Sequence, residues 1–331
     1  MVSVHETAYP RLKSNSTVHE LQEIYTPNPE EIAFASEATQ NDHTYLLCLI
    51  SLKTFQRLGY FINPIEIPMP IAQYIARQGG GEITAAQLSS YKDSASRSRH
   101  RDDIRAFLSL QPYRQAQTGA FLKTFLVEAA IARDDVADLI NLAVQELSRQ
   151  RIELPAFSTL IKIATAAQVE AARQLYQRVY QKLGQENREQ LARLWTESEA
   201  GMSLWEKVKT EPGKPTLTAM KDWLTRYEWL KQFNIDTQAM SSIPEIKAVE
   251  FAVEARVMHV DEIAAVTNKP RQYTLALALW TAQMAQTLDD LGELYVKRLM
   301  NMHFRAKDLF VQHQQDQQSQ IGDSCIMPRK G

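Results

Sequence analysis

The residues of this sequence that could form a binding site are basic residues at helical spacing, because their cations can bind negatively charged groups. Arg97, Arg101 and Arg105 follow one another at intervals of four residues, which places them on one face of a helix. Arg99 and His100 flank this row. Residues 92–114 hold six Lys and Arg residues against three acids, so this stretch is positive although the chain carries a net charge of −2. Such a face can neutralise phosphates, or it can be an ordinary solvated helix surface.

A second basic stretch lies around a predicted break between two helices, at residues 145–165. Arg149 and Arg151 come in the last turn of the first helix, where cations suit the negative end of the helix dipole. Pro155 biases the residue before it away from helical dihedrals. Ser158 or Thr159 is expected to cap the second helix by accepting hydrogen bonds from its first backbone N–H groups. The alternative interpretation is an ordinary helical hairpin.

A helix, a tight turn and a second helix can set a helix N-terminus and several cations against a phosphate backbone. Residues 149–193 hold eight Lys and Arg residues against four acids, so the positive charge continues along the second helix. The candidate DNA-binding residues are therefore Arg97, Arg99, His100, Arg101, Arg105, Arg149, Arg151, Ser158, Thr159, Lys162, Arg173 and Arg178.

The bulk composition describes a globular, helix-rich chain. Of 331 residues, 44% are apolar, 23% are charged and only 11 are glycine. The sequence pI near 6.4 is far from the value above about 9 that is usual for a nucleic-acid-binding domain. DNA binding therefore requires clustered positive charge. No run of 18 apolar residues and no apolar signal segment occur in the sequence, so we expect a cytoplasmic protein with no membrane partner.

The sequence offers no catalytic constellation. The two cysteines, Cys48 and Cys325, are far apart, and the seven histidines have no metal-ligand spacing. Phosphate-loop, dinucleotide-binding and nucleophile-elbow patterns do not occur in the sequence. Three acidic doublets, which begin at Asp102, Asp134 and Asp289, are interpreted as solvated or capping residues because neighbouring side chains on a helix point in different directions. We therefore expect no enzyme activity, no metal, no cofactor and no small-molecule substrate.

The apolar periodicity predicts an all-α protein built of tandem helical bundles with helix-turn-helix-like DNA-binding modules. Predicted helices include 18–25, 44–60, 91–110, 158–183, 216–233 and 272–314. In the helix that starts near Pro244, a stripe formed by Ile246, Val249, Val253 and Val257 is expected to be buried. The predicted modules are residues 1–115, residues 116–210 with the central helix-turn-helix-like element, and residues 211–312 with the long helix. A disordered tail is predicted for residues 313–331.

Five stretches in one order resemble the N-terminal third of the large replicative (class II) bacterial transposases, the family typified by the ampicillin-resistance transposon. The stretches are Arg11–Ala35, Leu52–Phe61, Ser94–Leu108, Leu147–Leu160 and Tyr273–Leu299. The first half of the chain looks like the helical domain of unknown function that opens those proteins. The similarity covers roughly residues 11–310, and no single motif within it is decisive.

The resemblance implies that the chain binds DNA and that it lacks the catalytic domain of the family. In that family, tandem helical modules in the N-terminal region bind the terminal inverted repeats of the transposon, and the acidic catalytic domain follows later in the chain. The end of this sequence, SCIMPRKG, departs from the family pattern. The resemblance therefore implies a DNA-binding fragment, a regulator or a gene remnant whose partner is double-stranded DNA. The alternative is a helical scaffold or an inhibitor that binds full-length transposase.

Purified protein is expected to show no strand cleavage or strand transfer with Mg²⁺ or Mn²⁺, because the sequence offers no convergent carboxylates to hold two metal ions. A nicking assay on supercoiled DNA measures this directly. Metal-dependent nicking that is lost on substitution of Asp102 or Asp289 would overturn the expectation.

Overall fold

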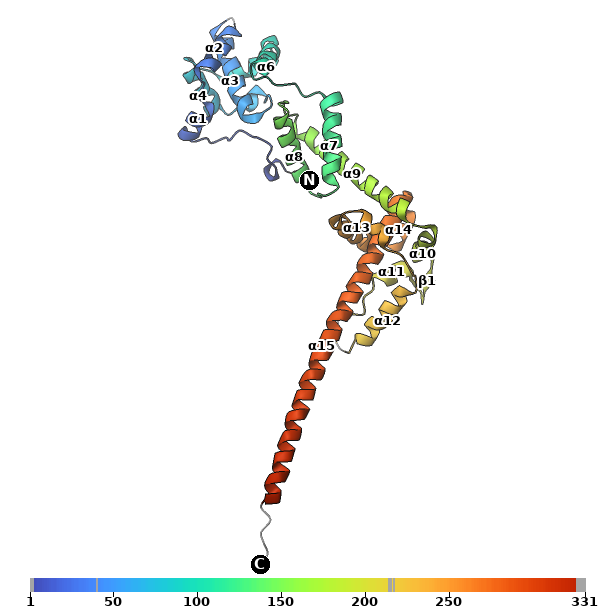
Figure 1. Cartoon of the computed structure of the whole chain (residues 1–331). Coiled ribbons are helices and arrows are strands. Elements are labelled where there is room, and N and C mark those ends of the chain that lie inside the picture. The colour runs from blue at the N-terminus through green and yellow to red at the C-terminus, as the bar shows by residue number, and fades with distance from the viewer. Residues whose placement is uncertain (1–2, 40, 214–215, 217, 326–331) are drawn as a thin grey trace, which may run out of the picture. The chain divides into compact units, whose positions relative to one another are not determined.

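The computed structural model describes residues 3–39, 41–213, 216 and 218–325, and these residues are almost entirely helical. They divide into two compact units, Met1–Ala172 and Arg173–Gly331. In the described part of the chain the only sheet is a two-stranded hairpin of Ser198–Glu199 (β1) and Met202–Ser203 (β2). The all-α class predicted from the sequence is confirmed (Figure 1).

Among its described residues, the first unit contains eight complete helices and the start of a ninth. These are α1 (Val18–Tyr25), α2 (Pro29–Glu37), α3 (Asp42–Leu58), α4 (Met69–Gln78), α5 (Ala85–Tyr91), α6 (Ala95–Phe107), α7 (Ala120–Ala130), α8 (Val136–Arg149) and the first turns of α9 (Phe157–Lys182). Short turns of other helix types lie at Val4–Glu6, Pro64–Glu66 and Gln115–Gly119. Residues 63–70 contain one of these turns and the start of α4.

Side-chain caps explain why several of these helices begin where they do. Thr17, Asn28 and Thr84 each accept from the backbone N–H three residues on, and the residue at that position reaches back to the cap. Ser94 caps α6 in the same way but without the return contact. Each capped N–H would otherwise lack a partner, so these residues set the start of each helix.

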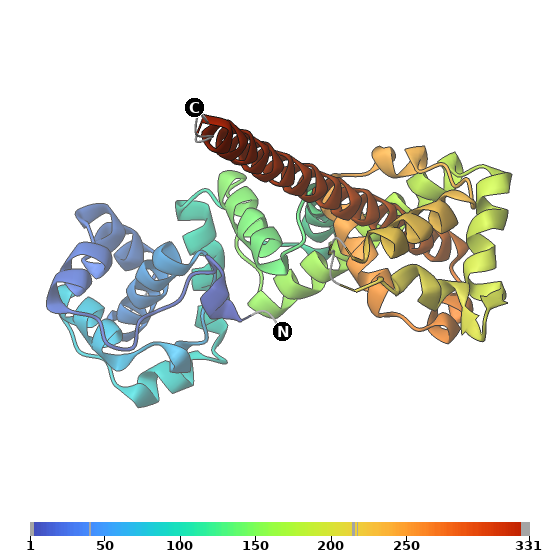
Figure 2. The same ribbon diagram turned by 90° about the horizontal axis from the view of Figure 1, so that it is seen from below.

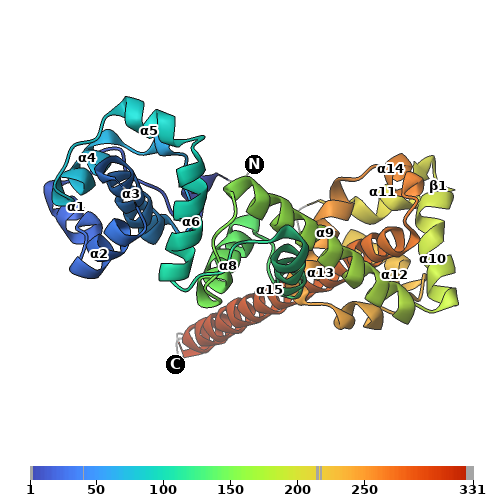
Figure 3. The same cartoon turned by 90° about the horizontal axis from the view of Figure 1, so that it is seen from above.

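The first unit has two hydrophobic cores. In the first, α3 lies at the centre of α1, α2, α4, α5 and α6 (Figure 3), and Leu49, Ile71, Ile75 and Ile104 are fully buried. The second core forms between α7, α8 and the start of α9. Its buried residues include Leu122, Leu126, Leu139, Ile140, Leu147, Leu160 and Ala164. Helix α6 contributes to the first core and α7 to the second.

The second unit contains the remaining helices. They are α10 (Gln185–Thr196), α11 (Leu204–Lys209), α12 (Met220–Lys231), α13 (Glu245–Val257), α14 (Val260–Ala265) and α15 (Lys269–Cys325), with a 3₁₀ turn at Gln238–Ser242. Fully buried Trp205, Trp223 and Trp280 fill its core. Trp205 lies on α11, and its indole N–H donates to the carbonyl of Met258 at 2.8 Å. The boundary that the sequence suggested near residue 210 thus differs from the observed division, because α10 and α11 pack with the later helices.

A buried arginine connects three segments of the second unit. The Arg226 guanidinium donates to the carbonyl of Val208 at 2.8 Å and to the Gln283 side chain at 2.7 Å. It also donates to Thr287 and to the carbonyl of Thr210. These acceptors satisfy a charge that would be costly to bury alone, and burial lowers the pKa of Arg226.

Helix α15 continues well beyond the rest of its unit (Figures 1 and 2). It has 57 residues, which corresponds to about 85 Å at 1.5 Å per residue. Beyond Leu294 every described side chain of α15 is exposed. The sequence predicted disorder from residue 313, whereas the helix continues to Cys325, and the last six residues lie outside the described range. The glutamine-rich composition that suggested disorder is also compatible with helix, because glutamine is a good helix former.

The predicted buried stripe of α13 is wrong. Ile246, Val249, Val253 and Val257 are 52–75% exposed. The buried face consists of Lys247, Phe251, Ala252 and Ala255 and packs against α15. Both sets of residues recur at helical spacing, so periodicity alone cannot choose between them. The smaller alanines beside one large ring let the two helices approach closely.

This correction can be tested by unfolding. Phe251→Ala is expected to lower the free energy of unfolding by about 3–5 kcal/mol, because it empties a buried site. Val253→Ser is expected to change it by less than about 0.5 kcal/mol. Urea denaturation monitored by circular dichroism measures both. A loss of several kcal/mol from Val253→Ser would restore the original assignment of the stripe.

Candidate nucleic-acid interface

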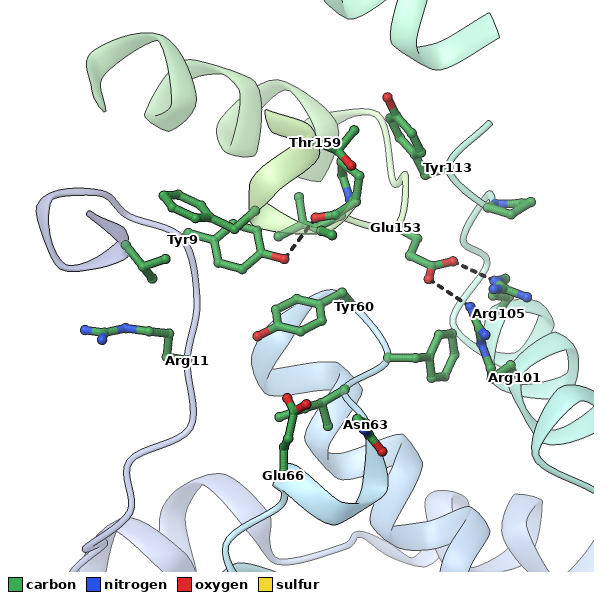
Figure 4. A pocket seen from close by; sticks show the side chains of 18 residues that line it. Tyr9, Arg11, Tyr60, Asn63, Glu66, Arg101, Arg105, Tyr113, Glu153 and Thr159 are labelled. Atoms are coloured by element: carbon green, nitrogen blue, oxygen red, sulfur yellow. Dashed lines mark hydrogen bonds and ion pairs between the residues drawn. The ribbon is translucent and has the colours of Figure 1, made fainter. Parts of the chain in front are cut away.

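The basic row on α6 and the turn between α8 and α9 are joined by one carboxylate, that of Glu153. The Arg105 Nε donates to Glu153 Oε2 at 2.9 Å, and Arg101 Nη2 lies 3.5 Å from Oε1. Both guanidiniums also lie over the ring of Phe61, at 4.9 Å for Arg101 and 5.1 Å for Arg105. The Glu153 side chain is only 11% exposed, so this is a nearly buried ionic cluster (Figure 4).

This cluster lines an open hollow of about 680 Å³ in the first unit. Tyr9, Tyr60, Glu66 and Thr159 lie around it (Figure 4). Arg11 is the third cation of its lining, which also contains the two carboxylates of Glu66 and Glu153. The two candidate stretches found in the sequence are therefore brought together, but the charges of Arg101 and Arg105 are already largely compensated.

Arg97 and His100 are held inside the first unit. Arg97 donates to the backbone carbonyls of Lys92 at 2.9 Å and Ile62 at 3.2 Å, and burial lowers its pKa. His100 is 3% exposed, and its Nδ1 is 2.9 Å from the Tyr91 hydroxyl. Burial lowers the pKa of His100, so its imidazole is neutral at pH 7. The prediction that His100 contacts DNA is at odds with this buried position.

Arg99 is the exposed cation of α6. Its guanidinium contacts the Ser96 hydroxyl at 3.4 Å, one turn earlier on the same helix. Arg99 is two residues from Arg97 and from Arg101, so its side chain leaves the opposite face of the helix. Its charge therefore has no carboxylate partner among the described residues.

The turn between α8 and α9 is fixed by its backbone. Gln111 N–H donates to the carbonyl of Arg151 at 2.9 Å, and the Glu153 N–H donates back to the carbonyl of Gln111 at 2.9 Å. The Leu154 N–H donates to the carbonyl of Gly59 at 2.8 Å. Gly59 ends α3 with a φ of 72°, and a Cβ at this position would meet the Leu154 side chain at 3.2 Å. A glycine is therefore needed both for the conformation and for the close contact.

Arg149 and Arg151 differ in the state of their charges. Arg149 makes two hydrogen bonds to the Glu146 carboxylate, at 2.8 and 2.7 Å. This contact lowers the pKa of Glu146 to about 2. Arg151 is exposed at the tip of the turn with a φ of 54°, and no described side chain supplies it with a partner. Arg151 is thus an uncompensated cation on a rigid backbone.

The start of α9 differs in detail from the prediction. The helix begins at Phe157, and the N–H groups of Thr159 and Leu160 donate to the carbonyl of Ala156. Ser158 and Thr159 therefore lie within the first turn and do not cap it. Ser158 and Lys162 are exposed, and Lys162 shares a surface hollow with Lys123 of α7, which the sequence reasoning missed.

The last two candidates lie on the part of α9 that belongs to the second unit. Arg173 and Arg178 are both exposed. No group of three or more potential metal-ligating side chains was found among the described residues. No described helix is long and apolar enough to cross a membrane.

Comparison with known proteins first defines the class of the N-terminal half. Residues 3–167 match a family model described as Domain of unknown function (DUF4158), and this part of the chain belongs to that family. The match covers the first unit up to the middle of α9 and includes the residues of both of its cores except Ala171.

The whole chain is similar to bacterial transposases. It is 24% identical over 317 residues to the transposase for transposon Tn501 of Pseudomonas aeruginosa, which covers 94% of this chain and 31% of that protein. It is 22% identical to the transposase for transposon Tn21 of Escherichia coli, over 79% of this chain and 26% of that protein. The resemblance to replicative transposases is confirmed, and the chain spans between a quarter and a third of the length of these relatives.

The ionic cluster is expected to matter for stability. Glu153→Ala leaves two guanidiniums without their shared carboxylate and should lower the free energy of unfolding by about 3 kcal/mol. Arg99→Ala, which removes an exposed charge from the same helix, should change it by less than about 0.5 kcal/mol. Equal and small effects in urea denaturation would show that the cluster is merely a surface contact.

Proposed function

We propose that this chain is a DNA-binding part of a transposase and that it recognises the terminal inverted repeats of a transposon. The relatives act in transposition according to their names, and the similarity covers nearly the whole chain. The proposed partner is double-stranded DNA, and the first unit supplies most of the proposed contacts. The second unit contributes Arg173 and Arg178 as further candidates.

The observation that carries this proposal is the exposed Arg151 on the fixed turn before α9. An uncompensated guanidinium whose backbone is held by hydrogen bonds loses little freedom when it binds a phosphate. Phosphate contacts set the position of a protein on the duplex, so a rigid turn is a suitable place for one. Arg99 on α6 is the second uncompensated candidate.

Cations that already have partners are expected to contribute less. Arg101 and Arg105 would have to leave Glu153, and Arg149 would have to leave Glu146, before they could bind a phosphate with full charge. In the slightly acidic chain, the specific placement of a few unpaired cations is therefore more important than the total charge.

Arg151→Ala and Arg149→Ala form a matched pair that tests the proposal. Alanine keeps a Cβ at position 151, so the positive φ is no more and no less strained than with arginine. Arg151→Ala should weaken binding to both the inverted repeat and a scrambled duplex. It should also lower the slope of log K against log salt by about 0.9. Arg149→Ala should have the smaller effect on both quantities.

Fluorescence anisotropy at two salt concentrations measures these affinities, and Arg151→Lys should restore the salt slope because it returns the charge. If the unsubstituted protein shows no preference for the inverted repeat, recognition of transposon ends is wrong. If Arg151→Ala binds as tightly as the unsubstituted protein, Arg151 is a solvated residue.

An interaction module is the second candidate function. It is favoured by the stripe of Ile246, Val249, Val253 and Val257 on α13, because these apolar side chains are 52–75% exposed. Under this alternative the chain binds another protein, such as a full-length transposase. Tight binding to purified transposase, together with no binding to DNA, would favour it.

A further inference from the structure

A second hollow, separate from the ionic cluster, lies between α7 and α9. Its volume is about 540 Å³. The residues that line it are Lys123, Ile161, Lys162, Thr165, Ala166, Val169 and Glu170. Six of the seven come from consecutive turns of α9, so the hollow is essentially one face of this helix with Lys123 beside it.

The two lysines of this hollow have no compensating contact. Both are exposed, and no described residue forms a hydrogen bond or ion pair with either ammonium group. Glu170 is the one carboxylate of the lining, which leaves a net charge of +1. Two unpaired cations that line one hollow favour a ligand with negative charge.

The adjacent face of α9 is shaped for close approach. Ser158, Lys162, Thr165 and Val169 are all exposed and recur at helical spacing. Val169 is 67% exposed, although valine in the middle of a helix is usually buried when the helix packs on a core. Between the lysine and the valine the side chains are small, so another molecule can come close to the helix backbone.

The opposite face of α9 holds this surface rigidly. Leu160, Ala164 and Ala167 are fully buried in the core shared with α7 and α8. The turn before α9 is fixed by the backbone hydrogen bonds of Arg151, Glu153 and Leu154. A helix presented in this way after a tight turn is the arrangement by which helix-turn-helix proteins place a second helix in the major groove.

We propose that this face of α9 enters the major groove of duplex DNA, a step that rests on the proposed function. Lys162, Thr165 and Val169 contact base edges: the ammonium group contacts guanine acceptors, and the methyl groups contact the methyl group of thymine. Lys123, on the neighbouring helix α7, contacts a backbone phosphate. In this arrangement α9 reads the bases, and α7 adds a phosphate contact that positions the protein on the DNA.

Single substitutions separate these two roles, and all of them remove exposed side chains. With the full chain and the same two duplexes, Lys162→Ala should weaken binding to the inverted repeat by roughly 5- to 150-fold and affect the scrambled duplex little. Lys123→Ala should weaken both duplexes alike and lower the salt slope by about 0.9. Val169→Ala should reduce discrimination between the duplexes and leave the salt slope unchanged.

Arg77→Ala on α4 is the control, since it removes an exposed cation far along the chain from this face. Far-UV circular dichroism and thermal melting establish that each variant is folded. If the unsubstituted protein prefers the inverted repeat and Lys162→Ala, Thr165→Ala and Val169→Ala all keep that preference, the assignment to α9 is wrong and the proposed function stands. If the unsubstituted protein has no preference, the proposed function itself fails.

Discussion

The first unit depends on how the turn between α8 and α9 is held. The backbone of this turn accepts a hydrogen bond from the N–H of Gln111 and donates one to the Gln111 carbonyl. It also donates one to the carbonyl of Gly59 at the end of α3. Glu153, from the same turn, binds two arginines of α6. These contacts connect residues that are about 40 to 95 positions apart in the chain, so they close long loops whose entropy must be offset by many simultaneous interactions. The N-terminal segment adds to this closure, because the Tyr9 hydroxyl donates to the carbonyl of Pro155 at 2.9 Å.

Helix positions were predictable because their signals are local. The predicted bounds of α1 agree with the structure, and the predicted helix 44–60 corresponds to α3 within two residues at each end. The break around Pro155 also appears as predicted, between α8 and α9. Capping, periodicity and helix-breaking residues act within a few positions of the chain, so a single sequence contains the information.

The choice of buried face and the division into units were less predictable, because they depend on the partner of each helix. On α13, two apolar sets compete, and packing against α15 decides in favour of Phe251 and its small neighbours.

The residues of the candidate site were also difficult to predict from the sequence alone. Charge counts gave equal weight to every arginine of residues 92–114, but Glu153, about 50 positions away, compensates two of them. His100 is buried for a similar reason, since Tyr91 and the first core surround it. Lys123 could have been found only by asking which helix would lie next to Lys162.

Under the proposed function, the contrast between compensated and uncompensated cations divides the basic residues of this protein into two groups. Arg97, Arg101 and Arg105 bond to carbonyls and a carboxylate inside the first unit, and so they fix the positions of α6 and of the turn. Arg99, Arg151, Lys123 and Lys162 are exposed without acidic partners among the described residues. A cation of the first kind is poorly suited to bind DNA, because a phosphate must replace a partner that is already well placed. A cation of the second kind gains a partner on binding and gives up only water and counterions. A chain with a net charge of −2 can therefore present a positive surface to DNA, provided that its carboxylates form ion pairs with the arginines that stabilise the fold.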